Sequence, residues 1–216
     1  MMPILVAAIL ASGSVAAQPA LVTDGQAIAQ HGTVPGRAAC AACHMANGAG
    51  QPDVGIPRLA GLTSSYIADQ LGYFASGARQ NAAMSSYAAA LTPAERLEVA
   101  NYFASLKLPP PTQDVAAMPV QLARGKDLFL NGDERTGLLG CSQCHGPTGL
   151  GVGDFSPRLA GQSEPYVQSK LQEWRSGALR DPKGIYMRAV ASHLSPADLQ
   201  AVAAYVASLQ EGPHTP

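Results

Sequence analysis

Cys40-Ala41-Ala42-Cys43-His44 and Cys141-Ser142-Gln143-Cys144-His145 are the two stretches that decide the fold of this 216-residue chain. Together they contain all 4 cysteines, and both have the form Cys-x-x-Cys-His. Two thiols at this spacing on a helical turn can each form a thioether with one vinyl group of a haem. The histidine that follows then faces the iron from the same side. The pattern therefore predicts one covalently attached c-type haem at each motif, with His44 and His145 as iron ligands.

Cysteine pairs at this spacing have other uses. One pair could form a redox dithiol or a disulfide, and two pairs could supply four thiolates to a zinc ion. These interpretations leave both adjacent histidines and the repeat described below unexplained. We therefore favour haem at both motifs.

A haem iron that carries electrons needs a second axial ligand, and each half of the chain offers one methionine at a matching position. Met84 follows His44 by 40 residues, and Met187 follows His145 by 42. We expect both in a loop just before a final helix. A thioether ligand favours Fe(II) and raises the reduction potential, which suits electron transfer. His193 is the competing candidate in the second half, although a loop histidine is the commoner interpretation.

The two motifs belong to an internal repeat of about one hundred residues. The segment Pro57-Arg58-Leu59-Ala60-Gly61 recurs as Pro157-Arg158-Leu159-Ala160-Gly161. Other matches follow in the same order at offsets of 100 to 103, which predicts two domains of one fold: Gly25 and Gly125, Gly32 and Gly132, Tyr66 and Tyr166, Leu71 and Leu171, Gly77 and Gly177, Thr92-Pro93 and Ser195-Pro196.

Helical signals dominate both repeats, and no run alternates in the manner of a strand. The final helix of each repeat has the best signals: Thr92 or Ser195 as N-cap, proline next, and an acidic residue in the first turn. The sequence predicts an all-α fold. A second helix in each repeat begins after Gly61 or Gly161 and includes residues 66–74 or 166–174, and a short one covers about 25–31 or 125–130.

The chain divides into four predicted segments. Residues 1–17 resemble a secretory signal peptide with a small-residue cleavage site, the alternative being an uncleaved anchor. The first domain is predicted over 18–108 and the second over 120–216. Between them, residues 109–119 begin with three prolines, which favour an extended linker.

Composition excludes some classes of function. Charged residues make up 13% of the chain and the formal net charge is −1. No basic field of the kind that nucleic-acid binding needs is present. Peripheral association with a membrane stays compatible with this composition.

Each half resembles a class I cytochrome c, and the tandem is similar to the cytochrome c4 family of periplasmic diheme electron carriers. The resemblance covers nearly all of the chain after residue 17. It implies covalent haem at Cys40, Cys43, Cys141 and Cys144, with axial ligands His44, Met84, His145 and Met187. It also implies that the Pro57 and Pro157 carbonyls accept a bond from the two histidines, and that the two domains pack face to face. One departure is Met45, which stands where the second motif is followed by Gly146.

Three functions are compatible with these sequence features. The first is an electron carrier between a quinol–cytochrome c oxidoreductase and a terminal oxidase. The second is a cytochrome subunit of a specific dehydrogenase, and the third is a diheme peroxidase. Because both halves supply a candidate methionine for the sixth position, the sequence favours electron transfer in the periplasm over catalysis.

Overall fold

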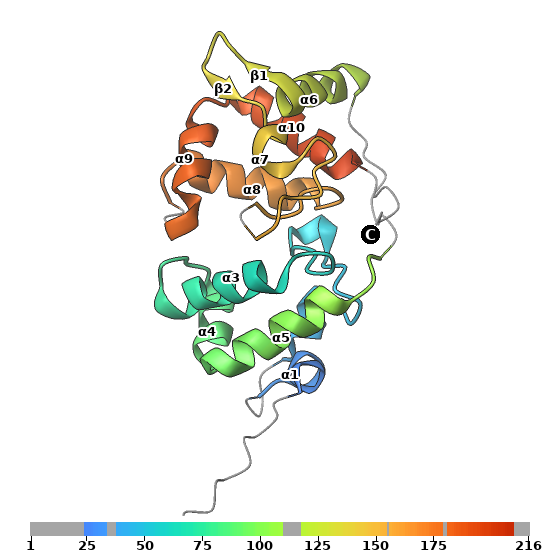
Figure 1. The fold of residues 1–216 in the computed structure, drawn as a ribbon, viewed down its shortest axis with the longest axis vertical. Helices are drawn as coiled ribbons and strands as arrows, with labels where there is room; N and C mark the ends of the chain where they lie inside the picture. Colours follow the sequence, from blue (N-terminus) through green and yellow to red (C-terminus); the bar gives the residue numbers. More distant parts are fainter. Residues whose placement is uncertain (1–23, 34–37, 110–117, 155, 179–180, 210–216) are drawn as a thin grey trace, which may run out of the picture.

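The computed structural model describes residues 24–33, 38–109, 118–154, 156–178 and 181–209. The predicted signal peptide and most of the predicted linker lie outside these residues. The chain forms two helical bodies, one from each repeat, stacked along the long axis of the molecule (Figure 1). The helices α3 and α8 lie on the sides of the two bodies that face each other (Figure 1).

Both repeats use the same order of α-helices, while their short 3-10 helices stand at different places. The first repeat contains α1 (Gly25–His31), α2 (Cys40–His44), η1 (Pro52–Val54), α3 (Ser64–Ser76), α4 (Ala82–Ala89) and α5 (Pro93–Ser105). The second contains α6 (Pro119–Asn131), β1 (Gly132–Asp133), β2 (Leu138–Leu139), α7 (Ser142–His145), α8 (Glu164–Arg175), η2 (Pro182–Gly184), α9 (Ile185–Ser192) and α10 (Pro196–Ser208).

Three details differ from the sequence-based prediction. The helix α6 begins at Pro119, the last residue of the predicted linker, because a proline suits the first helical position. The short antiparallel pair β1–β2 pairs Gly132 with Leu139, and two-residue strands are too short to show an alternating pattern. Met84 and Met187 lie within the short helices α4 and α9 rather than in loops.

The N-terminal signals of the last helix in each repeat are confirmed. The Thr92 side chain accepts a bond from the Glu95 backbone N–H, and the Glu95 carboxylate accepts one from the Thr92 N–H at 2.7 Å, a complete capping box. Ser195 caps α10 by accepting a bond from the Asp198 N–H at 3.1 Å. These bonds satisfy backbone donors that would otherwise lack a partner.

The first and last helices of each repeat cross at a glycine. A Cβ atom added at Gly25 would lie 2.1 Å from the Glu98 carbonyl oxygen of α5. At Gly125 it would lie 2.0 Å from the Ala201 carbonyl oxygen of α10. The backbones of the two helices therefore approach more closely than a residue with a Cβ atom would permit. This explains why the position is glycine in both repeats.

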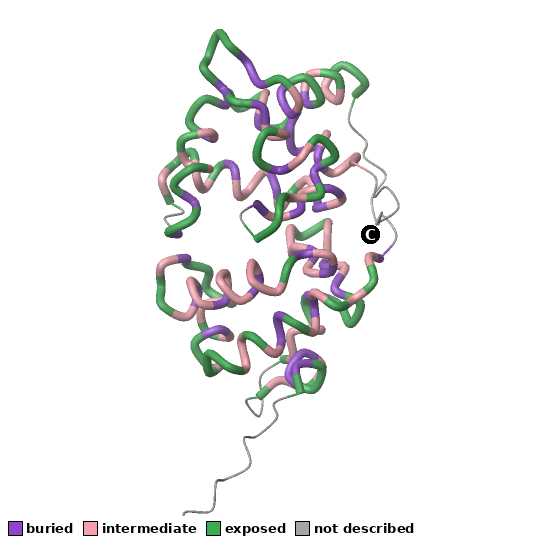
Figure 2. Tube along the Cα trace, viewed as in Figure 1, coloured by how far each residue is buried: buried purple, intermediate pink, exposed green. Residues whose placement is uncertain are grey.

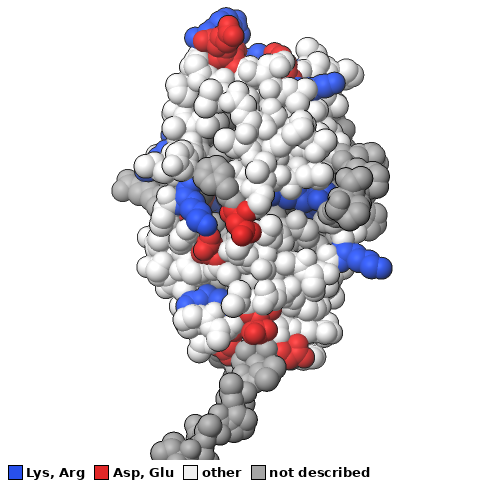
Figure 3. Space-filling model, viewed as in Figure 1, with Lys and Arg blue, Asp and Glu red and all other residues white. Residues whose placement is uncertain are grey.

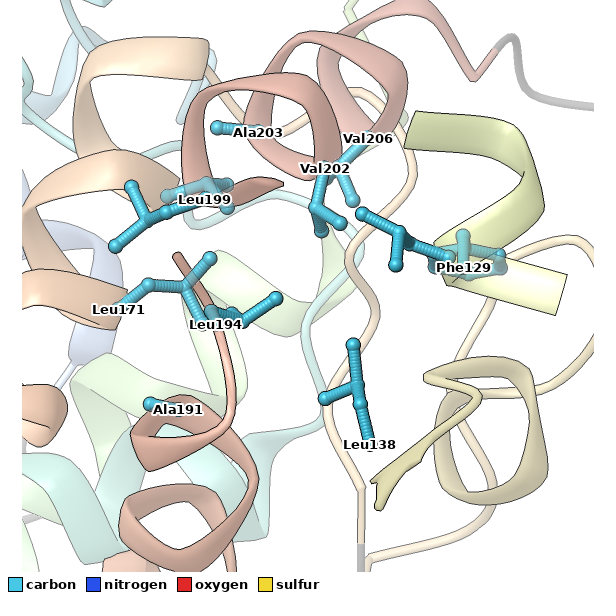
Figure 4. Close-up of a cluster of buried hydrophobic side chains, with 11 residues drawn as sticks. Phe129, Leu138, Leu171, Ala191, Leu194, Leu199, Val202, Ala203 and Val206 are labelled. Atoms are coloured by element: carbon cyan, nitrogen blue, oxygen red, sulfur yellow. The ribbon is translucent and has the colours of Figure 1, made fainter. Parts of the chain in front are cut away.

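Each body has its own apolar core (Figure 2). The second core collects side chains from α6, α8, α9 and α10, including Phe129, Leu171, Leu199 and Val206 (Figure 4). The first core contains Ile28, Leu71, Phe74, Val99 and Phe103. Two separate cores are what a tandem repeat predicts, since each repeat buries its own apolar faces.

The repeated Pro-Arg-Leu-Ala-Gly segments meet where the two bodies touch. The Gln162 side chain accepts a bond from the Arg58 N–H at 2.9 Å and donates one to the Arg58 carbonyl at 3.0 Å. The Arg58 guanidinium donates to the Ala160 carbonyl. Lys183 and Asp69 add an ion pair across the same junction.

Among the described residues, no helix combines the length and the apolar character that crossing a bilayer requires.

Candidate functional site

The histidine of each Cys-x-x-Cys-His motif is held by a backbone carbonyl from the same repeat. In the first repeat, His44 Nδ1 lies 3.0 Å from the Pro57 carbonyl oxygen. In the second, His145 Nδ1 lies 2.9 Å from the Pro157 carbonyl oxygen. A carbonyl only accepts, so Nδ1 must carry the proton in both rings. The Nε2 atom therefore keeps its lone pair for a metal.

The loop after each motif folds back in the same way and delivers that proline. The Gly50 N–H donates to the His44 carbonyl at 3.0 Å, and the Gly151 N–H donates to the His145 carbonyl at 2.9 Å. The Gly48 carbonyl accepts bonds from the Leu59 and Ala60 N–H groups, and the Gly149 carbonyl does the same in the second repeat. The matching bonds show that both repeats build one type of site.

Burial keeps both histidines neutral. Desolvation lowers the pKa of His44 and of His145, against a smaller opposing effect of the bond to the proline carbonyl. A neutral imidazole is the form that binds a metal ion.

A cavity of about 490 Å³ opens beside the first motif. Its size lies within the range of about 300–1,000 Å³ that is typical of small-molecule and cofactor pockets. His44 and Met84 both line it, so the structure brings together the two predicted axial ligands of the first repeat. Apolar side chains supply most of the remaining wall: Leu59, Leu62, Ile67, Leu71, Phe74, Leu91, Val99 and Phe103.

The second repeat arranges its predicted site residues in the same way relative to its core. Cys141 and Met187 both pack against the second apolar cluster, as Cys40 and Met84 pack against the first. Leu159 and Trp174 pack there as well. The two predicted sites are therefore equivalent in their elements and in their apolar surroundings.

The environments of Cys40 and Cys141 suit neutral sulfur. Burial raises the pKa of the Cys40 thiol and raises that of Cys141 to about 11. A thioether is neutral, whereas a zinc-bound thiolate is charged. Among the described residues, no three His, Cys, Asp or Glu side chains come together as metal ligands, and all four cysteines are free of disulfides. The geometry thus does not assemble the four-thiolate zinc site that the sequence left open.

His193 does not compete with Met187 for the second site. It is the C-cap of α9, and its exposed ring lies with Nδ1 2.7 Å from the Thr136 carbonyl oxygen beside the β1–β2 turn. His31 is exposed at the end of α1. Both belong to the surface of the molecule.

Comparison with known proteins decides the family. The family model for cytochrome c matches residues 22–107 and again residues 122–210. The chain belongs to the cytochrome c family. Its relatives place it in the diheme branch that resembles cytochrome c4.

Three relatives illustrate the similarity. A "thiosulfate dehydrogenase electron acceptor" from Thiomonas intermedia (strain K12) is 44% identical over 177 residues, which cover 81% of this chain and 80% of that protein. Reduced cytochrome c4 from Pseudomonas stutzeri superimposes with a TM-score of 0.73 at 30% identity, over 86% of this chain and 97% of that one. A thiosulfate dehydrogenase from Marichromatium purpuratum gives a TM-score of 0.77 at 38% identity, over 85% of this chain but only 39% of that one.

These findings confirm the central predictions from the sequence. This cytochrome has a mostly helical fold of two cytochrome c domains, carries two covalently bound haem c groups and transfers electrons. Sequence reasoning missed a group of residues that line the first cavity where the two bodies come together. Arg79 of the first body and Lys170 of the second line that cavity, together with Tyr166, which the sequence marked only as a repeated position.

Proposed function

We propose that this cytochrome is a periplasmic electron carrier that accepts electrons from a thiosulfate dehydrogenase and passes them to a later component of a respiratory chain. The observation that carries the proposal is the 44% identity to a thiosulfate dehydrogenase electron acceptor, and the two predicted haem sites, one in each repeat, support it. The predicted signal peptide over residues 1–17 supports the periplasm as its compartment.

We assign the two haem sites residue by residue. Cys40 and Cys43 would hold the first haem, with His44 and Met84 as the ligands of its iron. Cys141 and Cys144 would hold the second, with His145 and Met187 as the ligands of its iron. The residues fit the group: each histidine keeps Nε2 available, burial favours neutral sulfur at Cys40 and Cys141, and the first cavity is largely apolar and large enough to enclose a cofactor.

When bound, each haem supplies a one-electron Fe(III)/Fe(II) couple. The protein's own residues then have three tasks. The Pro57 and Pro157 carbonyls orient the histidines and fix their tautomer, the thioethers fix the position of the cofactor, and the apolar walls exclude water. Because none of these groups has to move or break a bond, the barrier to electron exchange stays low.

The first cavity lacks the equipment of a peroxidase. Glu173 is the one carboxylate among the described residues that line it, and its carboxylate pairs with the Lys170 ammonium at 2.5 Å. His44 is the one histidine in that lining, and its Nδ1 proton is held by the Pro57 carbonyl. A peroxidase needs an open iron position and a group that moves a proton. These observations favour the electron carrier over the diheme peroxidase at the first site.

Stopped-flow reduction tests the partner. Oxidised cytochrome is mixed with a purified thiosulfate dehydrogenase and thiosulfate, and the reduced haem bands are followed. We expect rapid reduction of both haems with enzyme and thiosulfate together, and none with thiosulfate alone. If the dehydrogenase fails to reduce it while a quinol–cytochrome c oxidoreductase succeeds, the proposed electron donor is wrong and the general respiratory shuttle replaces it.

The proposed distal ligands predict a spectroscopic result. The weak red-edge absorption band of methionine bound to Fe(III) should fall by about half in Met84→Ala and in Met187→Ala, each alone, because each variant removes one of two equivalent ligands. His193→Ala is the matched control and should leave the band unchanged, since His193 faces Thr136 on the surface. An unchanged band in Met187→Ala, with loss of ligation in His193→Ala, would reverse the assignment in the second half.

A further inference from the structure

Arg79 is a buried cation at the wall of the first cavity. Arg79 lies shortly after α3 in the chain, and only 7% of the residue is exposed. One guanidinium nitrogen donates to Gln70 Oε1 at 2.5 Å, and the guanidinium carbon lies 4.5 Å from the centre of the Phe74 ring. These contacts hold the side chain in one place at the cavity wall.

Arg79 forms no direct ion pair with a carboxylate among the described residues, and the buried Asp181 acts on its charge only as the smallest of several influences. The ion pairs there involve Arg124, Arg135, Lys170 and Lys183 as cations, and none involves Arg79. The partners of the guanidinium are a neutral amide, an aromatic face and a phenol. A buried charge whose direct partners are all neutral is costly, so its place beside a cavity points to an anion inside that cavity.

The second body also reaches this cavity. The other terminal nitrogen of Arg79 donates to the Tyr166 hydroxyl of α8 at 3.3 Å. Ser169, Lys170 and Glu173 of the same helix complete the wall. The first cavity is thus lined by both halves of the molecule, and Arg79 is directly bonded to the second half.

Haem carries two propionate groups, which are carboxylates at neutral pH. We propose that Arg79 is a positioning residue that binds a propionate of the first haem and links that haem, through Tyr166, to the second domain. The proposal rests on the proposed attachment of the first haem at Cys40 and Cys43. A guanidinium presents paired donors that match the two oxygens of a carboxylate.

A buried cation beside the first haem affects its reduction. Adding an electron removes one positive charge from the haem, so a fixed positive charge nearby stabilises the reduced state. The effect is strong where water is excluded. Arg79 should therefore raise the potential of the first haem and leave that of the second nearly unchanged.

The test is an optical redox titration of the whole diheme protein that resolves two midpoint potentials. Each potential is assigned to its haem by the methyl resonance of the ligand methionine in the NMR spectrum. In Arg79→Gln we expect the reduction equilibrium constant of the first haem to fall about tenfold, which is about 59 mV for one electron. Arg79→Lys, which keeps the charge, should restore most of the potential. Tyr166→Phe should lower it in the same direction by less.

Lys107→Gln is the matched control, because it also removes one positive charge but from an exposed residue outside the cavity. If Arg79→Gln and Lys107→Gln leave the first potential equally unchanged, the proposal is overturned. If Arg79→Gln does not fold, an unchanged first potential in Tyr166→Phe would overturn it as well. Intact mass distinguishes failure of the role of Arg79 from failure of the proposed haem attachment. A wild-type protein without haem at the first motif would overturn the attachment at Cys40 and Cys43.

Discussion

Met45 has a φ of 63° and a ψ of 153°, a backbone conformation that glycine adopts far more readily than methionine. It directly follows His44, and the matching residue of the second motif is Gly146, with a φ of 78° and a ψ of 156°. The loop must turn in this way to bring the proline carbonyl back to the histidine. The first repeat therefore contains local backbone strain that the second avoids.

Met45→Gly should stabilise the protein by about 1 kcal/mol, because relief of the strained backbone outweighs the greater freedom of glycine in the unfolded chain. The side chain is 45% exposed, so little packing is lost. Denaturant unfolding, followed by the methionine–iron band, measures the change. Met118→Gly is the control: Met118 is also exposed but has an ordinary φ of −64°, and its replacement should bring no gain. Equal effects of the two substitutions would show that Met45 is not strained.

At the scale of the helices, Gly25 and Gly125 set the distance between the first and last helices of each repeat. Gly125→Ala should destabilise the protein by about 3 kcal/mol, because the added methyl group would overlap the Ala201 carbonyl oxygen and force α6 away from α10. Gly72→Ala within α3 is the matched control. A Cβ atom there meets nothing within 4 Å. That variant should gain up to about 1 kcal/mol from the better helix propensity of alanine.

Thermal or denaturant unfolding of the two variants makes the comparison. Equal stabilities of Gly125→Ala and Gly72→Ala would contradict the close helix crossing as the reason for the repeated glycine.

The sequence predicted the elements that carry local signals. The cap residues Thr92 and Ser195 and the repeated Gly25 and Gly125 locate helices that the structure contains. It did not predict α4 and α9, which are eight residues each and have few boundary signals. It also missed the contact of Arg79 with Tyr166, because a contact between residues 87 positions apart depends on how the two bodies pack.

At the scale of the whole molecule, the two bodies are joined by direct hydrogen bonds as well as by the chain. Gln162, which is 5% exposed, satisfies both backbone groups of Arg58. The matching residue of the first repeat is Leu62, so this contact exists on one side of the junction only. Charges on the visible face are sparse and of mixed sign near the junction (Figure 3). The bonds between Gln162 and Arg58 therefore help to align the two bodies.

Gln162→Leu should remove these bonds and cost about 2 kcal/mol, because the buried Arg58 N–H and carbonyl would lose their partners. The expected signature is separation of thermal unfolding into two transitions, one for each body, in differential scanning calorimetry. Gln26→Leu, at an exposed position of α1, is the control and should keep the wild-type profile. A wild-type profile in Gln162→Leu would mean that these bonds do not couple the two bodies.

The central claim is that each repeat holds its own covalent haem. Intact mass spectrometry of the purified protein, after extraction of non-covalent groups, tests it directly. The predicted result is the mass of the polypeptide plus two haems, and plus one haem in either Cys40→Ala/Cys43→Ala or Cys141→Ala/Cys144→Ala. An unmodified polypeptide mass, with zinc bound to the native protein, would contradict the claim.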